Sequence, residues 1–308
     1  MTPVTVRVPA KLNLQLAVGP PRADGYHDLV TVFHAVSLFD EITAEPARRD
    51  SVSVSGEGAD RVPADGDNLA LRAVAALRAE VPSAPGVHIT IAKRIPVAAG
   101  LAGGSGDAAA ALVACNELWA GGFDPPRLAE IAARVGSDVA FALLGGTAVG
   151  RGRGEQLTPA LAPATQYHWV LAFADGQLST PEVYAALDRL RAADSPAPAS
   201  WGEPDLDAAL MSALRSGDAR MVGRALSNDL QSAAVSLFPA LRKTLTAGLE
   251  LGALGALVSG SGPTCVFLAA GADRALDLAV SLSGAGVCRS VARVAGPVPG
   301  AAIVSPAK

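Results

Sequence analysis

A glycine-rich segment from Pro96 to Asp107 offers the clearest chemistry in the sequence. Its four glycines precede an alanine-rich stretch that we expect to form a helix beginning near Ser105. Glycines allow successive backbone N–H groups to point the same way, and a helix N-terminus adds unpaired donors and a positive dipole end. Such an arrangement binds anions, and phosphate is its natural occupant. The alternative interpretation is a flexible loop that only caps a helix.

Other known phosphate-binding motifs do not fit this segment. A Walker loop ends in Gly-Lys-Ser/Thr, a tripeptide that the chain lacks. The glycines from Gly104 match the degenerate dinucleotide fingerprint only formally, because Pro96 and several further residues separate them from the preceding strand. The His-Arg-Asp and Asp-Phe-Gly signatures of protein kinases are also missing.

Lys11, Asn13 and Asp138 are the other polar residues that stand out. Lys11 and Asn13 share one face of an extended segment, where a solvated strand face is the ordinary interpretation. Asp138 begins an apolar helix, where it could serve simply as an N-cap. The helix dipole and a nearby lysine would both stabilise its carboxylate. Asp138 would then orient a hydroxyl group.

Two further segments have the composition of turns. Asp24–His27 contains Asp-Gly, a strong turn signal, and spacing alone favours a turn with a packed tyrosine. Gly260–Pro263 separates two apolar runs and is either a tight turn or a second polar loop that faces a ligand. No two of the four histidines have a metal-binding spacing, which argues against a histidine-based zinc or iron site.

Three of these motifs together resemble the GHMP kinase superfamily. They are Pro9–Leu14, Pro96–Asp107 and Val258–Cys265, which occur in the expected order and span the chain. The resemblance implies an α+β, two-domain fold with the active site in the interdomain cleft. We expect an N-terminal, ATP-binding domain over residues 1–163 and a C-terminal domain over residues 164–308.

The resemblance also implies an activity. The segment Arg22–Leu29, with its Asp-Gly-Tyr-His element, resembles the member that phosphorylates a cytidine diphosphate sugar alcohol at its 2-hydroxyl, in the non-mevalonate route to isoprenoid precursors. Homoserine and mevalonate kinases lack that element. The alternatives are another small-molecule kinase of the superfamily, such as a homoserine or sugar kinase, and a non-catalytic nucleotide-binding protein on the same fold. The implied cofactors are ATP and Mg²⁺.

Site residues follow from the matched motifs. Lys11 and Asp138 match the catalytic pair. The phosphates of ATP would contact the glycine-rich segment through Pro96, Gly100, Leu101, Ala102, Gly103, Gly104, Ser105, Gly106 and Asp107. Asn68 matches a residue near the adenine, and Ser105 would help to hold Mg²⁺. Tyr26 and Tyr184 would sandwich the cytosine, with His27, Asn13 and Thr180 in the same pocket.

The glycine-rich segment departs from the family pattern at two positions. Ala102 replaces a frequent glycine, and Gly106 replaces a common serine. An alanine is tolerated unless the backbone at that position requires a positive φ angle.

The elements that must position these residues can be predicted from periodicity. Alternation predicts a pair of strands joined at a kink at Pro9–Ala10, and further strands over 33–39, 51–55, 87–91 and 169–174. Helical spacing is expected over 68–79, for two stretches within 125–144 separated at Gly136, and over 182–192, 206–215 and 239–251. The order lacks a regular βαβ repeat, and the composition changes after residue 150.

Composition excludes several classes of protein. The chain has 308 residues, 50% of them hydrophobic, and a net charge of -4 without a basic cluster, so nucleic acid is not an expected partner. Its three scattered cysteines fit reduced thiols in the cytoplasm. The N-terminus does not resemble a signal peptide, and Ser259–Pro263 interrupts the longest uncharged stretch, so no membrane association is expected. We expect a monomer or a weak homodimer.

Overall fold

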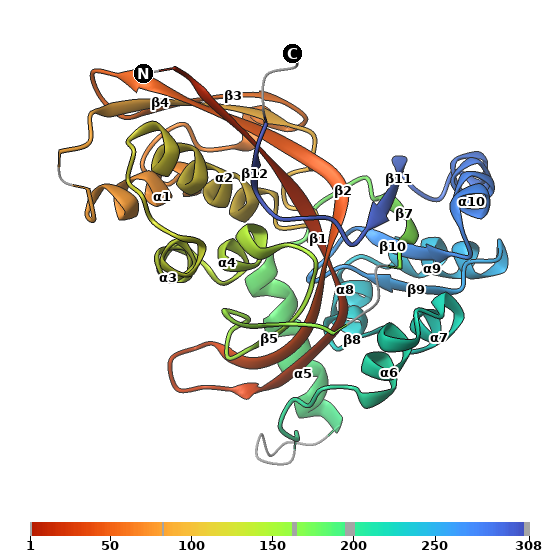
Figure 1. Ribbon diagram of the computed structural model, residues 1–308. Coiled ribbons are helices and arrows are strands. Elements are labelled where there is room, and N and C mark those ends of the chain that lie inside the picture. Colours follow the sequence, from red (N-terminus) through yellow and green to blue (C-terminus); the bar gives the residue numbers. More distant parts are fainter. Residues whose placement is uncertain (1, 82, 162–164, 195–200, 305–308) are drawn as a thin grey trace.

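The chain folds around two β-sheets (Figure 1). The computed structural model describes residues 2–81, 83–161, 165–194 and 201–304. The larger sheet has eight strands and the central order β12-β1-β2-β4-β3, with β5, β6 and β8 attached at its sides. In chain order these strands are β1 (Val4–Pro21), β2 (His27–Ala47), β3 (Ser51–Gly56), β4 (Gly86–Lys93), β5 (Thr147–Arg151), β6 (Gln156–Pro159), β8 (Ser227–Asn228) and β12 (Ala302–Ile303). Most of the described strand pairs in this sheet are antiparallel, and among them only β1–β8 and β3–β4 are parallel, which agrees with the expected α+β class.

The first two strands form one long antiparallel hairpin that runs the length of the molecule (Figure 1). The expected kinked strand pair at Pro9–Ala10 is therefore wrong, because β1 is a single strand of 18 residues. Its register against β2 shifts between Pro9 and Ala10. The bulge is in β2, where two extra residues lie between the partners of Pro9 and Ala10, and β1 continues past the proline, which has no N–H to donate. Lys11 and Asn13 lie just after this bulge.

Four helices pack against the first part of the large sheet, α1 (Leu69–Arg78), α2 (Gly103–Leu118), α3 (Pro125–Val135) and α4 (Ser137–Leu144) (Figure 1). The break at Gly136 between α3 and α4 is where the sequence predicts it. Residues 108–111 of α2 are alanines without exposed surface. Such small side chains let the helix approach the sheet closely, and that approach determines where the helix N-terminus lies.

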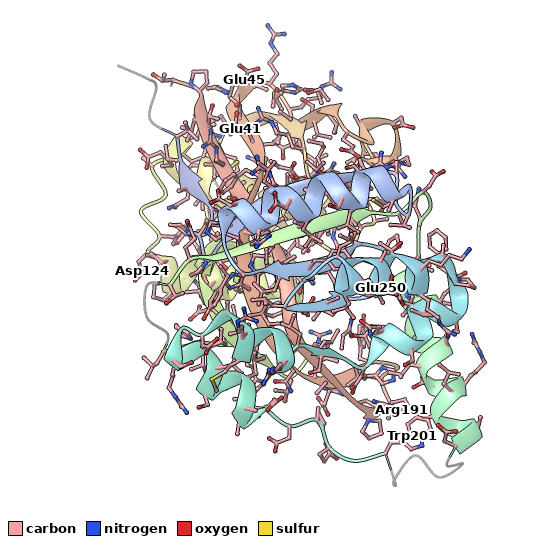
Figure 2. The ribbon with its side chains drawn as sticks, turned by 90° about the vertical axis from the view of Figure 1, so that its right-hand side faces the viewer. Glu41, Glu45, Asp124, Arg191, Trp201 and Glu250 are labelled. Carbon is pink, nitrogen blue, oxygen red and sulfur yellow. The ribbon has the colours of Figure 1, made fainter. Side chains whose placement is uncertain are left out.

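The second half of the chain is built on a four-stranded sheet with the order β11-β7-β10-β9. Its strands are β7 (Tyr167–Phe173), β9 (Gly255–Val258), β10 (Cys265–Ala269) and β11 (Ser290–Gly296). One face shares a core with β1 and β2, and the other packs under helices, with α10 lying across it in Figure 2. The helices of this half are α5 (Thr180–Asp194), α6 (Ala208–Ser216), α7 (Ala219–Arg224), α8 (Leu230–Leu237), α9 (Ala240–Glu250) and α10 (Ala272–Ala285).

The two halves share the large sheet. Both β8 and β12 come from the second half of the chain, and both pair with β1. The predicted domain boundary, between residues 163 and 164, lies outside the described residues and stays a prediction. Among the described residues, no helix has the length and apolar character needed to cross a membrane. All three cysteines are free.

His34 is the buried titratable group where the two sheets meet. Its ring on β2 has no exposed surface, and its Nδ1 lies 2.8 Å from the hydroxyl of Thr147. Its edge contacts Tyr167 and Trp169 of β7, with ring centroids 5.9 and 5.7 Å away. Burial lowers the pKa of His34 to about 3. The imidazole is therefore neutral in the folded protein at pH values where it would be protonated in the unfolded chain.

This burial predicts an acid-sensitive fold. Below pH 6.5 the unfolded chain binds a proton at His34 that the folded chain does not, so the free energy of unfolding falls as the pH drops from 6.5 toward 3. The contribution of this one group reaches up to about 1.4 kcal/mol per pH unit. We expect His34→Asn to have a smaller difference in free energy of unfolding between pH 7.5 and pH 5 than the parent, measured by urea titration. His88→Asn, at a histidine that hydrogen-bonds Ser51 on the sheet surface, is the control. An equal change in the free energy of unfolding between the two pH values for all three proteins would contradict the prediction.

Candidate active site

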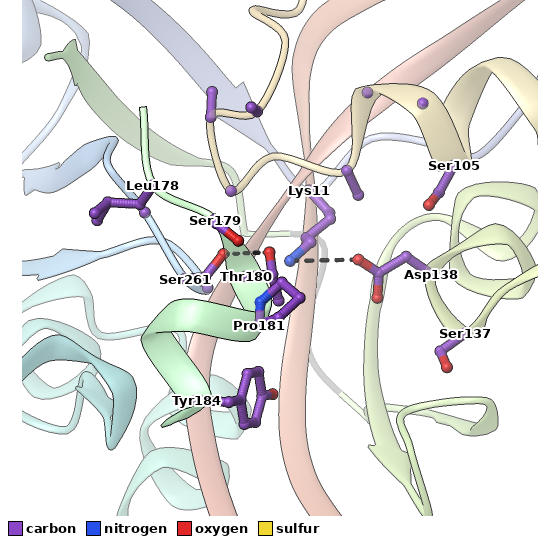
Figure 3. A pocket seen from close by; sticks show the side chains of 18 of the residues that line it. Lys11, Ser105, Ser137, Asp138, Leu178, Ser179, Thr180, Pro181, Tyr184 and Ser261 are labelled. Atoms are coloured by element: carbon purple, nitrogen blue, oxygen red, sulfur yellow. Dashed lines mark hydrogen bonds and ion pairs between the residues drawn. The ribbon is translucent and has the colours of Figure 1, made fainter. Parts of the chain in front are cut away.

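A cavity of about 1050 Å³ lies between the two halves of the chain. Its lining comes from β1, β2, the glycine-rich segment, the starts of α4 and α5, and the loop after β9. Figure 3 shows this arrangement, with side chains from both halves pointing into one space. The volume is at the upper end of the range for single ligand pockets. The cavity is therefore large for a site that holds one small ligand.

The glycine-rich segment connects β4 to α2 and forms one wall of the cavity. Helix α2 begins at Gly103, two residues before the expected start, so its first backbone N–H groups lie within the motif. Most of the predicted phosphate-contacting residues line the cavity. Leu101 and Gly106 are the exceptions, because Leu101 is buried in the core between the sheets and Gly106 packs on Val8. These two residues therefore pack against the core on the side of the loop that faces away from the cavity.

The alanine at position 102 occupies a strained backbone conformation. Its φ angle is +56°, in the left-handed region, and Ala98 in the same loop has a φ of +54°. Position 102 is thus one where glycine would be favoured, which answers the question raised by this departure from the family pattern. Gly104 has no positive φ, and a Cβ there would meet only Leu69, at 3.5 Å. The open side of Gly104 faces the cavity.

A buried ion network joins the two ends of this loop. Lys93, the last residue of β4, contacts Asp40 on β2 and lies 2.8 Å from a carboxylate oxygen of Asp107 on α2. Asp40 also accepts hydrogen bonds from the N–H groups of Arg94 and Ile95, at 2.6 and 2.8 Å. Sequence reasoning missed Lys93 and Asp40. The sequence feature that could have revealed them is a charged residue within an otherwise apolar strand next to the loop.

The network changes the proton affinities of its members. Burial raises the pKa of Asp107, and Asp40 raises it further, against the opposing effect of Lys93. Burial lowers the pKa of Lys93, but the two carboxylates outweigh that effect and the net shift is upward. The Lys93 ammonium is therefore a permanent charge beneath the loop. One carboxylate oxygen of Asp107 pairs with Lys93, and the other has no hydrogen-bond partner among the described groups.

Lys11 lines the cavity. Its ammonium donates to Asn13 Oδ1 at 2.7 Å, and Asn13 Nδ2 donates to the hydroxyl of Thr31 at 2.8 Å. All three side chains are buried, so the face predicted to be polar is an internal polar cluster and not a solvated strand face. The ammonium lies 3.6 Å from Asp138 Oδ2. Figure 3 shows Lys11 and Asp138 pointing toward each other across the cavity.

Asp138 does not cap its helix. Gly136 is the N-cap of α4, and no side-chain oxygen accepts a capping hydrogen bond there. The capping interpretation is therefore wrong, and the carboxylate faces Lys11 at the cavity. Its side chain retains 31% of its exposure. Burial raises the pKa of Tyr184, and the charge of Asp138 raises it further, which places the tyrosine within the field of this carboxylate.

The glycine turn after β9 closes the cavity next to Lys11. A Cβ on Gly260 would lie 3.4 Å from the Lys11 ammonium, so this turn approaches the site directly. The Ser261 hydroxyl is 2.8 Å from that of Thr180, at the start of α5 (Figure 3). Both side chains line the cavity. The two interpretations of Gly260–Pro263 are thus compatible, since the segment is a tight turn and also faces the ligand space.

The Asp-Gly-Tyr-His element is the turn between β1 and β2. Asp24 accepts a hydrogen bond from the N–H of Tyr26 at 3.1 Å, and Gly25 has a φ of +80°. The predicted turn is therefore confirmed, and its Tyr26 and His27 also line the cavity. Tyr26 is 55% exposed and has the guanidinium of Arg153 at 5.1 Å from its ring centroid.

The aromatic residue expected to face Tyr26 comes from α5. The ring centroid of Tyr184 lies 5.1 Å from that of His27, at a tilt of 37°. His27 is buried, and its Nε2 is 3.0 Å from Asp188 on the same helix as Tyr184. Sequence reasoning missed Asp188 and Arg153, since both lie far along the chain from the residues that they contact.

Asn68 caps helix α1 at the edge of the cavity. Its Oδ1 accepts from the N–H of Ala70 at 2.8 Å, and its Nδ2 donates to the carbonyl of Pro63 at 2.7 Å. The side chain is buried but belongs to the cavity lining. Its structural role is clear, and its predicted position near the adenine remains a prediction.

The donors around the glycine-rich segment bear on metal binding. Among the described residues, no three His, Cys, Asp or Glu side chains come together as a metal site. Ser105, in the first turn of α2, offers a single hydroxyl to the cavity, and Asp107 is engaged with Lys93. One hydroxyl suits an ion whose other ligands are phosphate oxygens and water, as Mg²⁺ prefers.

Comparisons with known proteins agree with this geometry. The family model for the GHMP kinases N terminal domain matches residues 68–146, and that for the GHMP kinases C terminal matches residues 210–288. A 4-diphosphocytidyl-2-C-methyl-D-erythritol kinase from Thermobifida fusca is 59% identical, over 98% of this chain and 99% of its own. One of the same name from Nocardia farcinica is 56% identical, over 99% of this chain and 97% of its own.

Solved structures extend the comparison. The crystal structure of a 4-(cytidine 5'-diphospho)-2C-methyl-D-erythritol kinase has a TM-score of 0.75 and 34% identity, covering 94% of this chain and 98% of that one. A homoserine kinase from Cytophaga hutchinsonii has the same TM-score of 0.75 at only 19% identity, covering 99% of this chain and 98% of that one. The second likeness shows a shared fold.

The strain at position 102 predicts a stabilising substitution. We expect Ala102→Gly to raise the free energy of unfolding by about 0.5–1 kcal/mol, because glycine adopts a positive φ without the Cβ clash. Urea titration measures the change. Ala110→Gly, in the interior of the same helix, is the matched control and should lower it by about 1 kcal/mol or more. A loss of stability in Ala102→Gly would show that the loop does not hold this conformation in solution.

Proposed function

The chain belongs to the GHMP kinase family and uses ATP to phosphorylate a small molecule, and we propose that its acceptor is the 2-hydroxyl of 4-diphosphocytidyl-2-C-methyl-D-erythritol. One observation supports this most strongly. A single cavity brings together the glycine-rich segment, the Lys11–Asp138 pair and the cluster of Tyr26, His27 and Tyr184. Those three groups suit a triphosphate, a reacting hydroxyl and a nucleobase.

The Lys11–Asp138 pair suits phosphoryl transfer to an alcohol. This reaction needs little covalent help from the protein, and catalysis comes from positioning and from charge stabilisation. Asp138 would accept the hydrogen bond of the acceptor hydroxyl and then its proton. Lys11 would offset the negative charge that develops near the same oxygen. Asn13 fixes the ammonium by its 2.7 Å hydrogen bond, so the lysine is held in place before substrate binds.

The glycine-rich segment would hold ATP. The first turn of α2 presents unpaired N–H groups and the positive end of the helix dipole to the cavity, which favours phosphate. Asn68 lies at the edge of the same cavity, consistent with the adenine end. Mg²⁺ held by the phosphates would supply further charge neutralisation, and Ser105 is the side chain of this chain best placed to contact it. The positive charge of Lys11 would then offset negative charge on the acceptor side.

The cytidine moiety would occupy the space lined by Tyr26 and Tyr184. A base between two aromatic faces gains stacking energy from each. The 5.1 Å contact of Arg153 with the Tyr26 ring holds this exposed side chain in position. His27 would read the polar edge of the base, with Asn13 and Thr180 lining the rest of the pocket. We further propose that the enzyme is cytoplasmic, that it is a monomer or a weak homodimer, and that it has no nucleic acid partner.

The mechanism predicts a large effect of one charge. Asp138→Asn should lower kcat by about two orders of magnitude or more, the effect typical of losing a general base. The fold should persist because the side chain makes no capping hydrogen bond. Steady-state kinetics give kcat, and calorimetry with ATP should find an affinity within a few-fold of the parent. The control is Asp124→Asn at the N-cap of α3, which should leave kcat unchanged. Near-parental turnover by Asp138→Asn would remove this residue from the mechanism.

The acceptor can be identified by direct competition. A coupled assay of ADP release should find the cytidylyl methylerythritol substrate far better than homoserine or mevalonate. Tyr26→Ala should weaken binding of that substrate roughly 5- to 150-fold, from the loss of about 1–3 kcal/mol of stacking, while Tyr26→Phe should be nearly silent. The KM for ATP should hardly change in either variant. Equal use of acceptors without a nucleobase by the parent enzyme would refute the assignment and favour another small-molecule kinase of the family.

A further inference from the structure

Asp188 holds one nitrogen of the His27 ring. The His27 Nε2 lies 3.0 Å from Asp188 Oδ1, and this is the one hydrogen bond of the imidazole among the described residues. His27 is buried, with 8% of its surface exposed. Its Nδ1 has no partner within the described part of the chain, yet it is not among the buried unpaired atoms there. Because His27 lines the cavity, Nδ1 is open to a ligand there.

The helix that carries Asp188 is fixed against the hairpin that carries His27. Arg191, one turn further along α5, donates to the carbonyl of Gly19 at 3.2 Å and to Asp229 at 3.0 Å. Asp229 in turn accepts from the N–H of Val18 at 2.9 Å. Figure 2 shows Arg191 beside Trp201, whose ring centroid lies 5.9 Å from the guanidinium. The pairing of Asp188 with His27 is therefore built into the packing of α5 on β1.

A carboxylate can only accept hydrogen bonds, so the imidazole nitrogen that faces it must carry the proton. In the neutral imidazole the other nitrogen then has a free lone pair and is an acceptor. We propose that Asp188 fixes His27 in the Nε2–H tautomer, so that Nδ1 accepts a hydrogen bond from the amino group of cytosine and rejects uracil. Asp188 is thus a positioning residue for base selection. This inference rests on the proposed cytidylyl substrate.

The tautomer determines which base is preferred. Cytosine presents an amino donor where uracil presents a carbonyl acceptor. An Nδ1 lone pair bonds the amino group, but it faces a second lone pair when uracil binds, and both acceptors are then left unpaired. The opposite tautomer would donate to the uracil carbonyl and would favour the wrong base. Specificity of this kind depends on a polar edge whose mismatch is costly.

Nitrogen NMR tests the tautomer without substrate or activity. The full-length protein is labelled with ¹⁵N-histidine, and the chain has only four histidines, so His27→Asn assigns the signal. We expect the parent to show the Nε2–H tautomer at His27 and Asp188→Ala to lose that preference. Asp194→Ala, at an exposed residue at the end of the same helix, should leave the spectrum unchanged. An Nδ1–H tautomer or a doubly protonated ring in the parent at pH 7.5 would overturn the proposal.

Kinetics test the consequence for base selection. The parent should prefer the cytidylyl over the uridylyl substrate in kcat/KM, and Asp188→Ala should reduce that preference at least about tenfold, the effect of losing one well-placed hydrogen bond to a polar edge. The KM for ATP should stay within about twofold in this comparison. Asp188→Asn keeps an oxygen that can accept from Nε2–H and should restore part of the preference. If the role of Asp188 were merely structural, Asp188→Ala would lower kcat/KM for both substrates alike and leave their ratio unchanged. That result would overturn the proposal.

The two hypotheses fail in different ways. If the parent does not phosphorylate the cytidylyl substrate at all, the proposed function is wrong whatever the tautomer. If the parent prefers the cytidylyl substrate but Asp188→Ala keeps the same preference, the function stands and the role of Asp188 is wrong.

Discussion

The close contact between two glycine turns creates the site. Gly100, in the loop before α2, has a φ of +74°, and a Cβ there would lie 2.1 Å from the carbonyl oxygen of Ser259 in the turn after β9. The Ser259 hydroxyl donates to the Gly100 carbonyl at 3.0 Å. Any side chain at position 100 would force these turns apart. The two halves of the chain meet there, and that meeting brings the Gly260 turn next to Lys11.

Electrostatics in the site follow from where charges are buried. Lys93 is surrounded by two carboxylates, which offset the cost of removing its ammonium from water, whereas the raised pKa of Asp107 shows that the burial of its own charge is only partly offset. Lys11 has a different arrangement, since its shortest contact is the neutral Asn13 and its carboxylate neighbour is 3.6 Å away. The first lysine therefore stabilises the loop. The second retains capacity to interact with a ligand.

The aromatic side of the cavity likewise combines an exposed residue with a buried residue that its neighbours hold in place. Tyr26 is exposed at the tip of a hairpin, while His27, the next residue, is buried and bonded to Asp188. Arg191 fixes α5 to that hairpin through Gly19 and Asp229. This space is therefore lined by one exposed ring, with the Arg153 guanidinium 5.1 Å from its centroid, and by one fixed polar edge. Under the proposed function, such a combination would give affinity by stacking and selectivity by hydrogen bonding.

Local sequence alone determined a large part of this protein. Glycine spacing indicated a loop that leads into a helix, Asp-Gly indicated the turn at 24–27, and helical periodicity located the break at Gly136, because each of these depends on the backbone preferences of a few neighbouring residues. The motif order identified the family, which the comparisons confirm. Pro9 misled the prediction of β1, since a bulge that keeps the strand continuous depends on pairing with β2.

Contacts between distant segments decided the rest. The interpretation of Asp138 as a cap failed because a capping bond depends on side-chain geometry, and here the carboxylate faces Lys11 from across the cavity. Asp40 and Lys93 are 53 residues apart, and His27 and Asp188 are 161 apart. No local pattern encodes such pairs. They exist because the sheet and the packing of α5 bring their strands and helices together. Only the tertiary structure shows that Lys93 pairs with two buried carboxylates, whereas the shortest contact of Lys11 is with the neutral Asn13.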